Sequence, residues 1–266
     1  MTQASLTHDI IAAFAGEMTP KFLATLNAER VPNVVPIISL EAVDEKTLIF
    51  GEFMMWKTRR NLEVNPCVAA AVITTELKGW VVKGEFVEFQ RTGPYFDRIM
   101  GRGLFRYNAY TGVRSAGVIR VREVTDAFRL SQFEVLVGLL RSRLGAAQAK
   151  QHPGDAVMPA PVREKFSRLK ALKMLAYCDS DGYPTIFPVL SLLPAGERNL
   201  VFAIPSRSVP PLGAEVAVCV ITFDPVAYQI KGKFCGIERG VGGPVGVIAV
   251  SEVYSACPPL PGERLA

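Results

Sequence analysis

The sequence has few of the residues that many catalytic and metal sites require. It contains two histidines, His8 and His152, and five dispersed cysteines that form no Cys-x-x-Cys pair. These shortages argue against a Ser-His-Asp triad, a Cys-His pair and a Cys/His zinc site. The glycine-rich residues 240–246 do not open a helix after a strand, so they match a dinucleotide-binding loop poorly. Dispersed thiols are typical of a reducing compartment, and we expect a cytoplasmic protein.

Long hydrophobic runs are also missing. No stretch of about 18 apolar residues is available for a transmembrane helix, and residues 1–6 lack the pattern of a signal peptide. We therefore expect no membrane association. Hydrophobic residues make up 49% of the 266 residues and charged residues 21%, which is enough to bury a core and argues against disorder. The length suits one large domain or two of ordinary size.

Positive charge is in excess. The net charge is +5 and the sequence pI is about 9.0, which suggests an anionic partner. Residues 91–122 contain a single acid, Asp97. The arginines of this segment are Arg91, Arg98, Arg102, Arg106, Arg114, Arg120 and Arg122. Because they are spread along the segment, a phosphate-bearing ligand or a solvated surface ranks ahead of nucleic acid, and we expect no nucleic-acid partner.

The second half of the chain repeats the first. Residues 21–40 align without gaps with residues 173–192, so that Pro184 stands where Pro32 does, at an offset of 152. Both X-Pro spacings and the order of the apolar runs are kept. Chance similarity of two β segments would not preserve these features together, so we interpret the pattern as a duplication.

The copies differ in length at one place. Lys83-Gly84 matches Lys231-Gly232 at an offset of 148, so the second copy lacks four residues. The loss falls on residues 53–66 (FMMWKTRRNLEVNP), where the second copy has SRSVPPLGAE and two prolines that argue against a helix. A ligand bound there would be bound once per chain. The recurring Lys-Gly pair indicates either a ligand contact or, more often for a strand glycine, a bulge or barrel corner.

Apolar periodicity predicts the main elements. A helix is expected over residues 7–16, with Thr7 as its cap. The strands expected in the first copy are residues 21–26, 31–40, 48–50, 67–74 and 80–89. Residues 94–171 are expected to lie between the copies. They should hold a helix capped by Asp126, a linker over residues 146–161 and a helix over residues 162–172. One face of the first of these helices carries Phe133, Leu136, Val137, Leu140 and Leu144.

Residues 53–66 contain the candidate binding site. Thr58 is expected to cap a short helix that an Asn-Pro pair ends, which gathers Lys57 and two arginines at the helix N-terminus. Backbone N–H groups, the helix dipole and cations together suit a phosphate monoester. Asn61 adds an amide one turn further on. A basic turn on a solvated surface is the alternative.

These motifs, in the order FLATLNAERVPNVVPIISL, LIF and KTRRNLEVNPCVAAAVI, resemble the pyridoxamine 5'-phosphate oxidase-like family of flavin-binding split barrels. The resemblance covers about residues 20–90 and, as a degenerate copy, residues 165–240. Arg30 stands where the family usually has glycine. The resemblance implies a mainly β fold with flanking helices, of the α+β class, with two split β-barrel copies in one chain. The expected parts are copy 1 over residues 1–125, a helical insert and linker over 126–160, and copy 2 over 161–266.

The resemblance also implies FMN as the cofactor. It places the phosphate near Lys57, Thr58 and Asn61 and the ring along the second and third strands. The residues that it implies as cofactor-binding are Val35, Pro36, Ile37, Ser39, Gly51, Glu52, Trp56, Lys57, Thr58 and Asn61. Ser191 and Lys231 are the expected contacts from the second copy. No metal ligand and no catalytic residue is predicted, and Trp56 either stacks on the ring or a substrate, or caps the barrel core.

The leading interpretation is therefore an FMN-dependent oxidoreductase that acts on a small molecule and takes electrons from a separate donor. The alternative is a non-catalytic protein that binds flavin, deazaflavin or haem on the same scaffold, because a fold alone does not define a function. Family members are usually homodimers. A fused tandem supplies both barrels in one chain, so either a monomer or a homodimer is expected.

Overall fold

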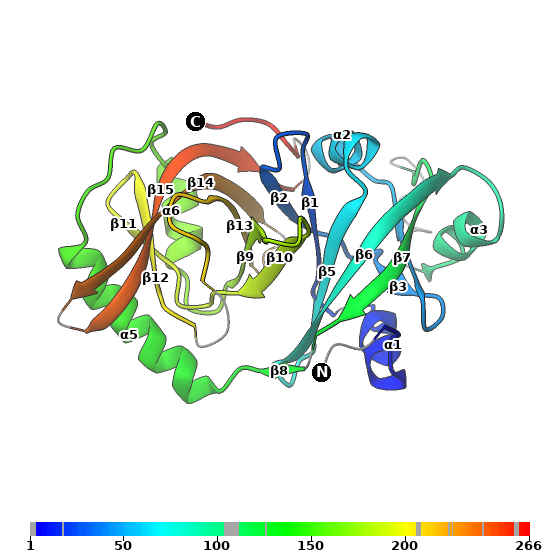
Figure 1. The fold of residues 1–266 in the computed structure, drawn as a ribbon, viewed down its shortest axis with the longest axis horizontal. Helices are drawn as coiled ribbons and strands as arrows, with labels where there is room; N and C mark the ends of the chain where they lie inside the picture. The colour runs from blue at the N-terminus through cyan, green and yellow to red at the C-terminus, as the bar shows by residue number, and fades with distance from the viewer. Residues whose placement is uncertain are drawn as a thin grey trace. The chain divides into compact units, whose positions relative to one another are not determined.

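The protein is described by a computed structural model that covers residues 4–17, 19–103, 112–125, 127–205, 209–222, 224, 226–240, 242–257 and 261–266. The chain forms two compact units (Figure 1). The first unit consists of Met1–Glu29, Pro36–Arg129 and Ser180–Thr185. The second consists of Arg30–Val35, Leu130–Asp179 and Ile186–Ala266. The division into copies at residues 125 and 160 stays a prediction.

One sheet carries the first unit. Its strands are β1 (Lys21–Leu26), β2 (Pro32–Pro36), β3 (Glu41–Ala42), β4 (Thr47–Gly51), β5 (Cys67–Ile73), β6 (Lys78–Gln90), β7 (Ala116–Val124) and β8 (Phe128–Arg129). The order across the sheet is β2-β1-β5-β6-β7-β4-β3, and β8 pairs with β6. The helices are α1 (His8–Ala15), α2 (Trp56–Val64) and α3 (Pro94–Met100). β1 is buried along its whole length, as apolar residues at consecutive positions predict for a strand covered on both faces.

A second sheet has the same plan. Its strands are β9 (Leu172–Cys178), β10 (Pro184–Pro188), β11 (Leu193–Ala195), β12 (Asn199–Ala203), β13 (Glu215–Ile221), β14 (Ala227–Gly240) and β15 (Gly243–Ser255). They lie in the order β10-β9-β13-β14-β15-β12-β11, which matches the first sheet strand for strand. The helices α5 (Gln132–Gln148) and α6 (Ala160–Ser167) belong to the second unit. The matching order confirms two split-barrel copies in a mainly β chain.

The recurring Lys-Gly pair marks a bulge in each copy. The pairing register shifts between Lys83 and Gly84 and again between Lys231 and Gly232. A Cβ on Gly84 would lie 2.6 Å from the carbonyl oxygen of Arg120, and one on Gly232 would lie 2.3 Å from that of Ala249. Only glycine allows the neighbouring strand to approach this closely, so the bulge interpretation is confirmed.

Residues 94–171 differ from the prediction. They contain β7, a full member of the first sheet, so this stretch is not simply a connection between copies. Asp126 lies outside the described residues, and the helix begins at Gln132 with Ser131 as its N-cap. The helix expected over residues 162–172 is α6, which ends at Ser167 because β9 begins at Leu172.

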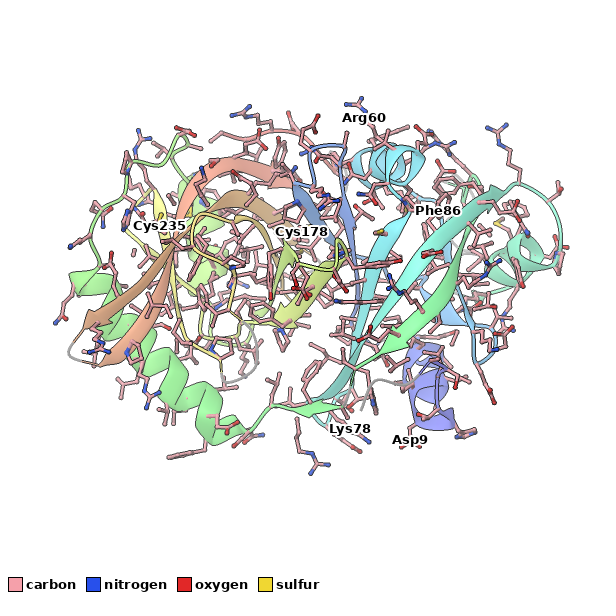
Figure 2. The ribbon with its side chains drawn as sticks, viewed as in Figure 1. Asp9, Arg60, Lys78, Phe86, Cys178 and Cys235 are labelled. Carbon is pink, nitrogen blue, oxygen red and sulfur yellow. The ribbon has the colours of Figure 1, made fainter. Side chains whose placement is uncertain are left out.

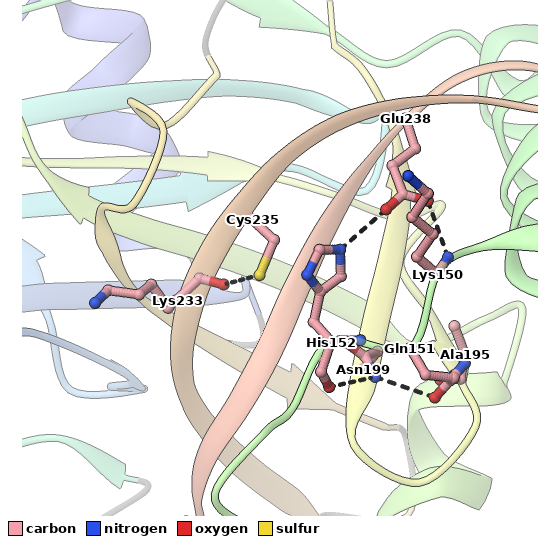
Figure 3. Close-up of polar contacts among 8 residues, drawn as sticks. All are labelled: Lys150, Gln151, His152, Ala195, Asn199, Lys233, Cys235 and Glu238. Carbon is pink, nitrogen blue, oxygen red and sulfur yellow. Dashed lines mark hydrogen bonds and ion pairs between the residues drawn. The ribbon is translucent and has the colours of Figure 1, made fainter.

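The linker before α6 is held by polar contacts within the second unit (Figure 3). The Nε2 atom of His152 lies 3.0 Å from Oε1 of Glu238, and the backbone N–H of Lys150 donates to Oε2 of Glu238 at 3.0 Å. Asn199 donates to the carbonyl oxygen of His152 at 3.2 Å. One of the two histidines therefore fixes a linker, which is a structural role.

The cysteines form no disulfide: all five carry free thiols. Cys178 and Cys235 are labelled in Figure 2, and both are half-buried. Among the residues that the structure describes, no helix is long and apolar enough to cross a membrane.

Candidate cofactor site

The candidate site is built around the start of α2. The helix begins at Trp56, and its N-cap is Met55, whose side chain makes no capping hydrogen bond. The prediction that Thr58 caps the helix is wrong. Thr58 lies within the first turn and is 1% exposed, because α2 starts two residues earlier so that Thr58, Asn61 and Leu62 form its buried face. The first turn contains no acid, so its backbone N–H groups face no carboxylate from their own helix.

The buried face of α2 packs against β1. The Nδ2 atom of Asn61 donates to Oγ1 of Thr25 at 2.9 Å, and both side chains are buried. The helix ends at Val64, and the N–H of Asn65 donates to the carbonyl oxygen of Asn61 at 2.8 Å. The predicted Asn-Pro stop is confirmed. Asn61 therefore helps to anchor the helix that presents Lys57, which is half-buried.

A buried carboxylate lies beside this helix. Glu52, directly after β4, is 4% exposed. Its Oε1 accepts a hydrogen bond from Nη1 of Arg59 at 2.5 Å, and its Oε2 accepts one from Oγ of Ser115 at 2.5 Å. Arg59 also donates to Glu63 at 3.0 Å and lies 4.6 Å from the ring centroid of Phe89. The sequence grouped Arg59 with the phosphate-binding cations, whereas the structure gives it two carboxylate partners.

These contacts keep Glu52 charged. Burial raises the pKa of its carboxyl group, but the hydrogen bonds from Ser115 and Arg59 outweigh burial and leave the pKa below its usual value. An ionised Glu52 is compensated locally by Arg59. Its negative charge is therefore partly screened from the start of α2, where an anion would bind.

Trp56 and Arg114 form the exposed part of the site. The indole of Trp56 is 53% exposed, and the guanidinium carbon of Arg114 lies 4.4 Å from its ring centroid. Trp56 is therefore not a cap of the barrel core, and a planar group could stack on it. Arg60 is also exposed, on the outer side of α2 (Figure 2).

The predicted strand residues have structural roles as well. Oγ of Ser39 accepts a hydrogen bond from the N–H of Gly51 at 3.0 Å. In the second copy, Oγ of Ser191 accepts one from the N–H of Ala203 at 3.1 Å, at the matching position. A contact that recurs in both copies serves the fold. A Cβ on Gly51 would lie 3.0 Å from Cγ2 of Ile99, so a larger residue there would require that side chain to shift.

The remaining predicted residues are less closely grouped. Ile37 is buried, and Val35 and Pro36 are half-buried at the end of β2. Val35 and Lys231 belong to the second unit, whereas α2 belongs to the first. The structure thus brings Ser39 together with Gly51, and it places Glu52 beside the helix that carries Trp56, Lys57, Thr58 and Asn61.

Sequence reasoning missed the side chains supplied by the segment before β7. Arg114 and Ser115 both contact predicted site residues, but the sequence pattern assigned no strand to residues 116–124. Recognising the alternation in β7, where Val121 is buried between exposed Arg120 and Arg122, would have indicated a strand in this segment.

The described residues of the second copy show no counterpart of α2 and Glu52. Among the described residues between β12 and β13, 204–205 and 209–214, there is no helix. Ile204 stands at the position of Glu52, so the buried carboxylate is absent too. Within the described part of the chain, no group of three or more His, Cys, Asp or Glu side chains is arranged to hold a metal ion.

Structures similar to this chain each match about half of it. HupZ from Group A Streptococcus is 26% identical and covers 48% of this chain and 95% of its own, with a TM-score of 0.38. An FMN-binding protein from Syntrophomonas wolfei is 20% identical over 46% of this chain and 85% of its own, with a TM-score of 0.40. A candidate pyridoxamine 5'-phosphate oxidase from Lactobacillus delbrueckii is 18% identical over 47% of this chain and 96% of its own, with a TM-score of 0.39. The similar structures thus include an FMN-binding protein and a candidate pyridoxamine 5'-phosphate oxidase, the kinds of protein that the sequence resembles. No family model and no curated protein matches the chain.

Proposed function

We propose that the first unit binds FMN and that the protein is an FMN-dependent oxidoreductase acting on a small molecule. The observation that carries the proposal is the start of α2: it has no side-chain cap and no acid in its first turn, and it carries Lys57. A helix N-terminus with a cation suits a phosphate monoester, which is the charged end of FMN. This arrangement occurs in the first copy, so the expected ratio is one FMN per chain.

The residues near α2 fit the two ends of such a cofactor. Lys57 and the first-turn N–H groups would hold the phosphate, while the exposed face of Trp56 offers a surface for a planar ring or a substrate. Bound FMN would supply the electron-accepting chemistry, and the chain would supply placement and electrostatics. The electron donor, the cytoplasmic location and the absence of a nucleic-acid partner remain proposals of the same kind.

A non-catalytic protein that binds flavin or deazaflavin is the second candidate. It is favoured by the structural use of the chain's polar groups: His152 fixes a linker, and the ionised Glu52 is held by Arg59 and Ser115. The same use of His152 makes haem the least favoured ligand, because histidine is a common axial ligand of haem iron. The absorption spectrum of the purified protein distinguishes flavin from haem, and turnover with a reduced nicotinamide distinguishes an enzyme from a carrier.

The phosphate assignment is tested by the variant Lys57→Ala. Removal of one charge-assisted contact should weaken FMN binding by roughly ten- to a hundredfold. Binding of riboflavin, which has no phosphate, should change much less. The measurement is a fluorescence titration of both ligands.

The control is Lys231→Ala in the second copy, the counterpart of Lys83, which should leave the difference between FMN and riboflavin unchanged. Equal losses for both ligands in Lys57→Ala would show that the lysine supports the fold or the ring, and the phosphate site would be refuted. An FMN:protein ratio close to two would contradict the single site.

A further inference from the structure

Within the second unit, helix α5 packs against the second sheet through small residues. A Cβ on Gly145 would lie 2.8 Å from Cγ1 of Val245, and one on Gly138 would lie 3.2 Å from Cβ of Ser191. Oγ of Ser142 accepts a hydrogen bond from the N–H of Ala203 at 2.8 Å. Gly138, Ser142 and Gly145 are all buried, so this face of the helix is fixed to the sheet. The choice of small residues allows the helix axis to approach the strands closely.

The opposite face of α5 is apolar and exposed. Phe133 is 73% exposed, Leu136 64%, Leu140 61% and Leu144 42%. Together with half-buried Val137, these side chains form what we call the α5 stripe. Phe133, Val137, Leu140 and Leu144 follow the 4-3-4 spacing of a two-helix seam. Large apolar side chains gathered on one exposed helix face indicate a binding surface, whereas single ones need no explanation.

The charges beside the stripe suggest what covers it. Glu134 and Arg141 flank one side and Arg143 the other; all are exposed, and none forms an ion pair within the described residues. If two copies of α5 lie antiparallel with their stripes in contact, Glu134 of each copy comes beside Arg141 of the other. A parallel arrangement would instead bring Arg141 beside Leu136 of the other copy, with no charge of opposite sign facing it. Flanking charges set the partner and the orientation of paired helices, and here they favour the antiparallel one.

We propose that the α5 stripe is a self-association surface, through which two copies of this chain pair by antiparallel α5 helices. A helix of this length spans about 25 Å. Two such helices cover less area than the roughly 1,200 Å² that a stable dimer usually buries. The dimer is therefore expected to be weak and to depend on protein concentration. This surface lies on another element than the proposed cofactor site and does not depend on it.

The test is sedimentation velocity on the full-length protein from about 5 to 200 µM. The wild type should shift from monomer to dimer across this range. Leu140→Glu should raise the dissociation constant at least tenfold, because it places a charge in the seam. Far-UV circular dichroism checks that each variant is folded, which is expected because the substituted side chain is exposed.

A charge swap tests the antiparallel pairing. Glu134→Arg and Arg141→Glu should each weaken the dimer several-fold, because each places like charges side by side. The double variant should restore the dissociation constant to within about threefold of the wild type. The proposal is overturned if the protein is a monomer at every concentration. That result is also expected if another part of the chain covers the stripe. A dimer that is indifferent to all variants, or singles that the double does not rescue, overturns it as well.

Discussion

The connection between β4 and β5 and the matching connection between β12 and β13 are the clearest difference between the copies. The first contains α2, with Lys57 near an uncapped N-terminus and Glu52 held by Arg59 and Ser115. The second is four residues shorter, has two prolines, and shows no helix among its described residues. The difference between the copies, as far as the structure describes them, is therefore confined to a connection between strands, where changes disturb the sheet least.

The parts that support the sheet are shared. Both copies have the same strand order and the same bulge. In both, a serine hydroxyl accepts a hydrogen bond from the last N–H of a strand: Ser39 from Gly51 in β4, and Ser191 from Ala203 in β12. Lys21 and Lys173 are matching buried lysines, which donate to the carbonyl oxygens of Ile38 and Leu190 at 3.3 and 3.4 Å. Comparison of the copies thus separates residues that both copies of the fold use from residues that occur in one copy.

The largest effect is expected from filling the bulges. In Gly232→Ala the new Cβ would meet the backbone of Ala249, which cannot rotate away, so we expect a loss of about 3 kcal/mol or more. Gly84→Ala should cost somewhat less because its nearest backbone contact is longer, 2.6 Å against 2.3 Å. Urea denaturation of both variants measures the two losses. If both alanines are tolerated, the shared bulge is not a requirement of the fold.

A smaller effect is expected from the matching lysines. Burial lowers the pKa of Lys173 to about 8 in the folded protein. Between about pH 8 and 10.5 the unfolded chain therefore binds more protons at this position, and stability rises with pH in that window. Lys173→Met removes the cost of the buried charge and should stabilise the protein at pH 7 by up to about 3 kcal/mol.

The advantage of Lys173→Met over the wild type should fade as the pH rises to 10.5, which thermal denaturation at several pH values measures. Lys21→Met is the matched variant. Burial, followed by the charge of Arg102, lowers the pKa of Lys21 to about 8, while nearby Glu41 acts in the opposite direction. We expect a similar gain. A gain that does not depend on pH would mean that added apolar contacts, not the charge, stabilise these variants.

The smallest effect is expected at Glu52, which sharpens the contrast with Ile204. Glu52→Gln keeps the shape of the side chain but weakens its bonds to Arg59 and Ser115, at a cost of about 1–2 kcal/mol at pH 7. Since the folded pKa of Glu52 is lowered, its contribution is present above the unfolded pKa and is lost as the pH falls through the folded value. Glu52→Gln and the wild type should therefore converge in stability at low pH.

Urea denaturation at pH 7 and at pH 3 makes this comparison. Ile204→Val, the control in the second copy, should lower stability equally at both pH values, because it changes only apolar contacts. A Glu52→Gln variant as stable as the wild type at pH 7 would show that the buried ion pair contributes nothing net.

Much of the fold could be predicted because the sequence contains two copies of the same strand pattern. The aligned prolines and apolar runs located β1, β2, β4, β5 and β6, and the change of offset located the divergent connection. The start of α2 was harder, because Thr58 satisfies the rules for a helix cap but is buried within the first turn, and only tertiary packing decides that. The same holds for Arg59, whose partner Glu52 lies seven residues earlier in an extended segment.

Two elements misled the sequence reading for a physical reason. In β7, Arg120 and Arg122 are the exposed side of an alternating strand, but in a run of arginines they suggested a charged surface segment. In α5, the apolar side would ordinarily be the buried one. The glycines and Ser142 reverse this, because they let the helix pack on its small face. Neither pattern reveals its orientation without the surrounding strands.

The membership of Ser180–Thr185 in the first unit has a consequence for biosynthesis. Nζ of Lys83 reaches Oδ2 of Asp181 at 2.7 Å, and the hydroxyl of Tyr183 donates to Glu85 at 2.7 Å, each across 98 positions of the chain. A nascent chain lacks these partners until residue 183 has been made, although the last strand of the first sheet ends at Arg129. These two contacts of the first unit therefore form only after part of the second repeat has been synthesised.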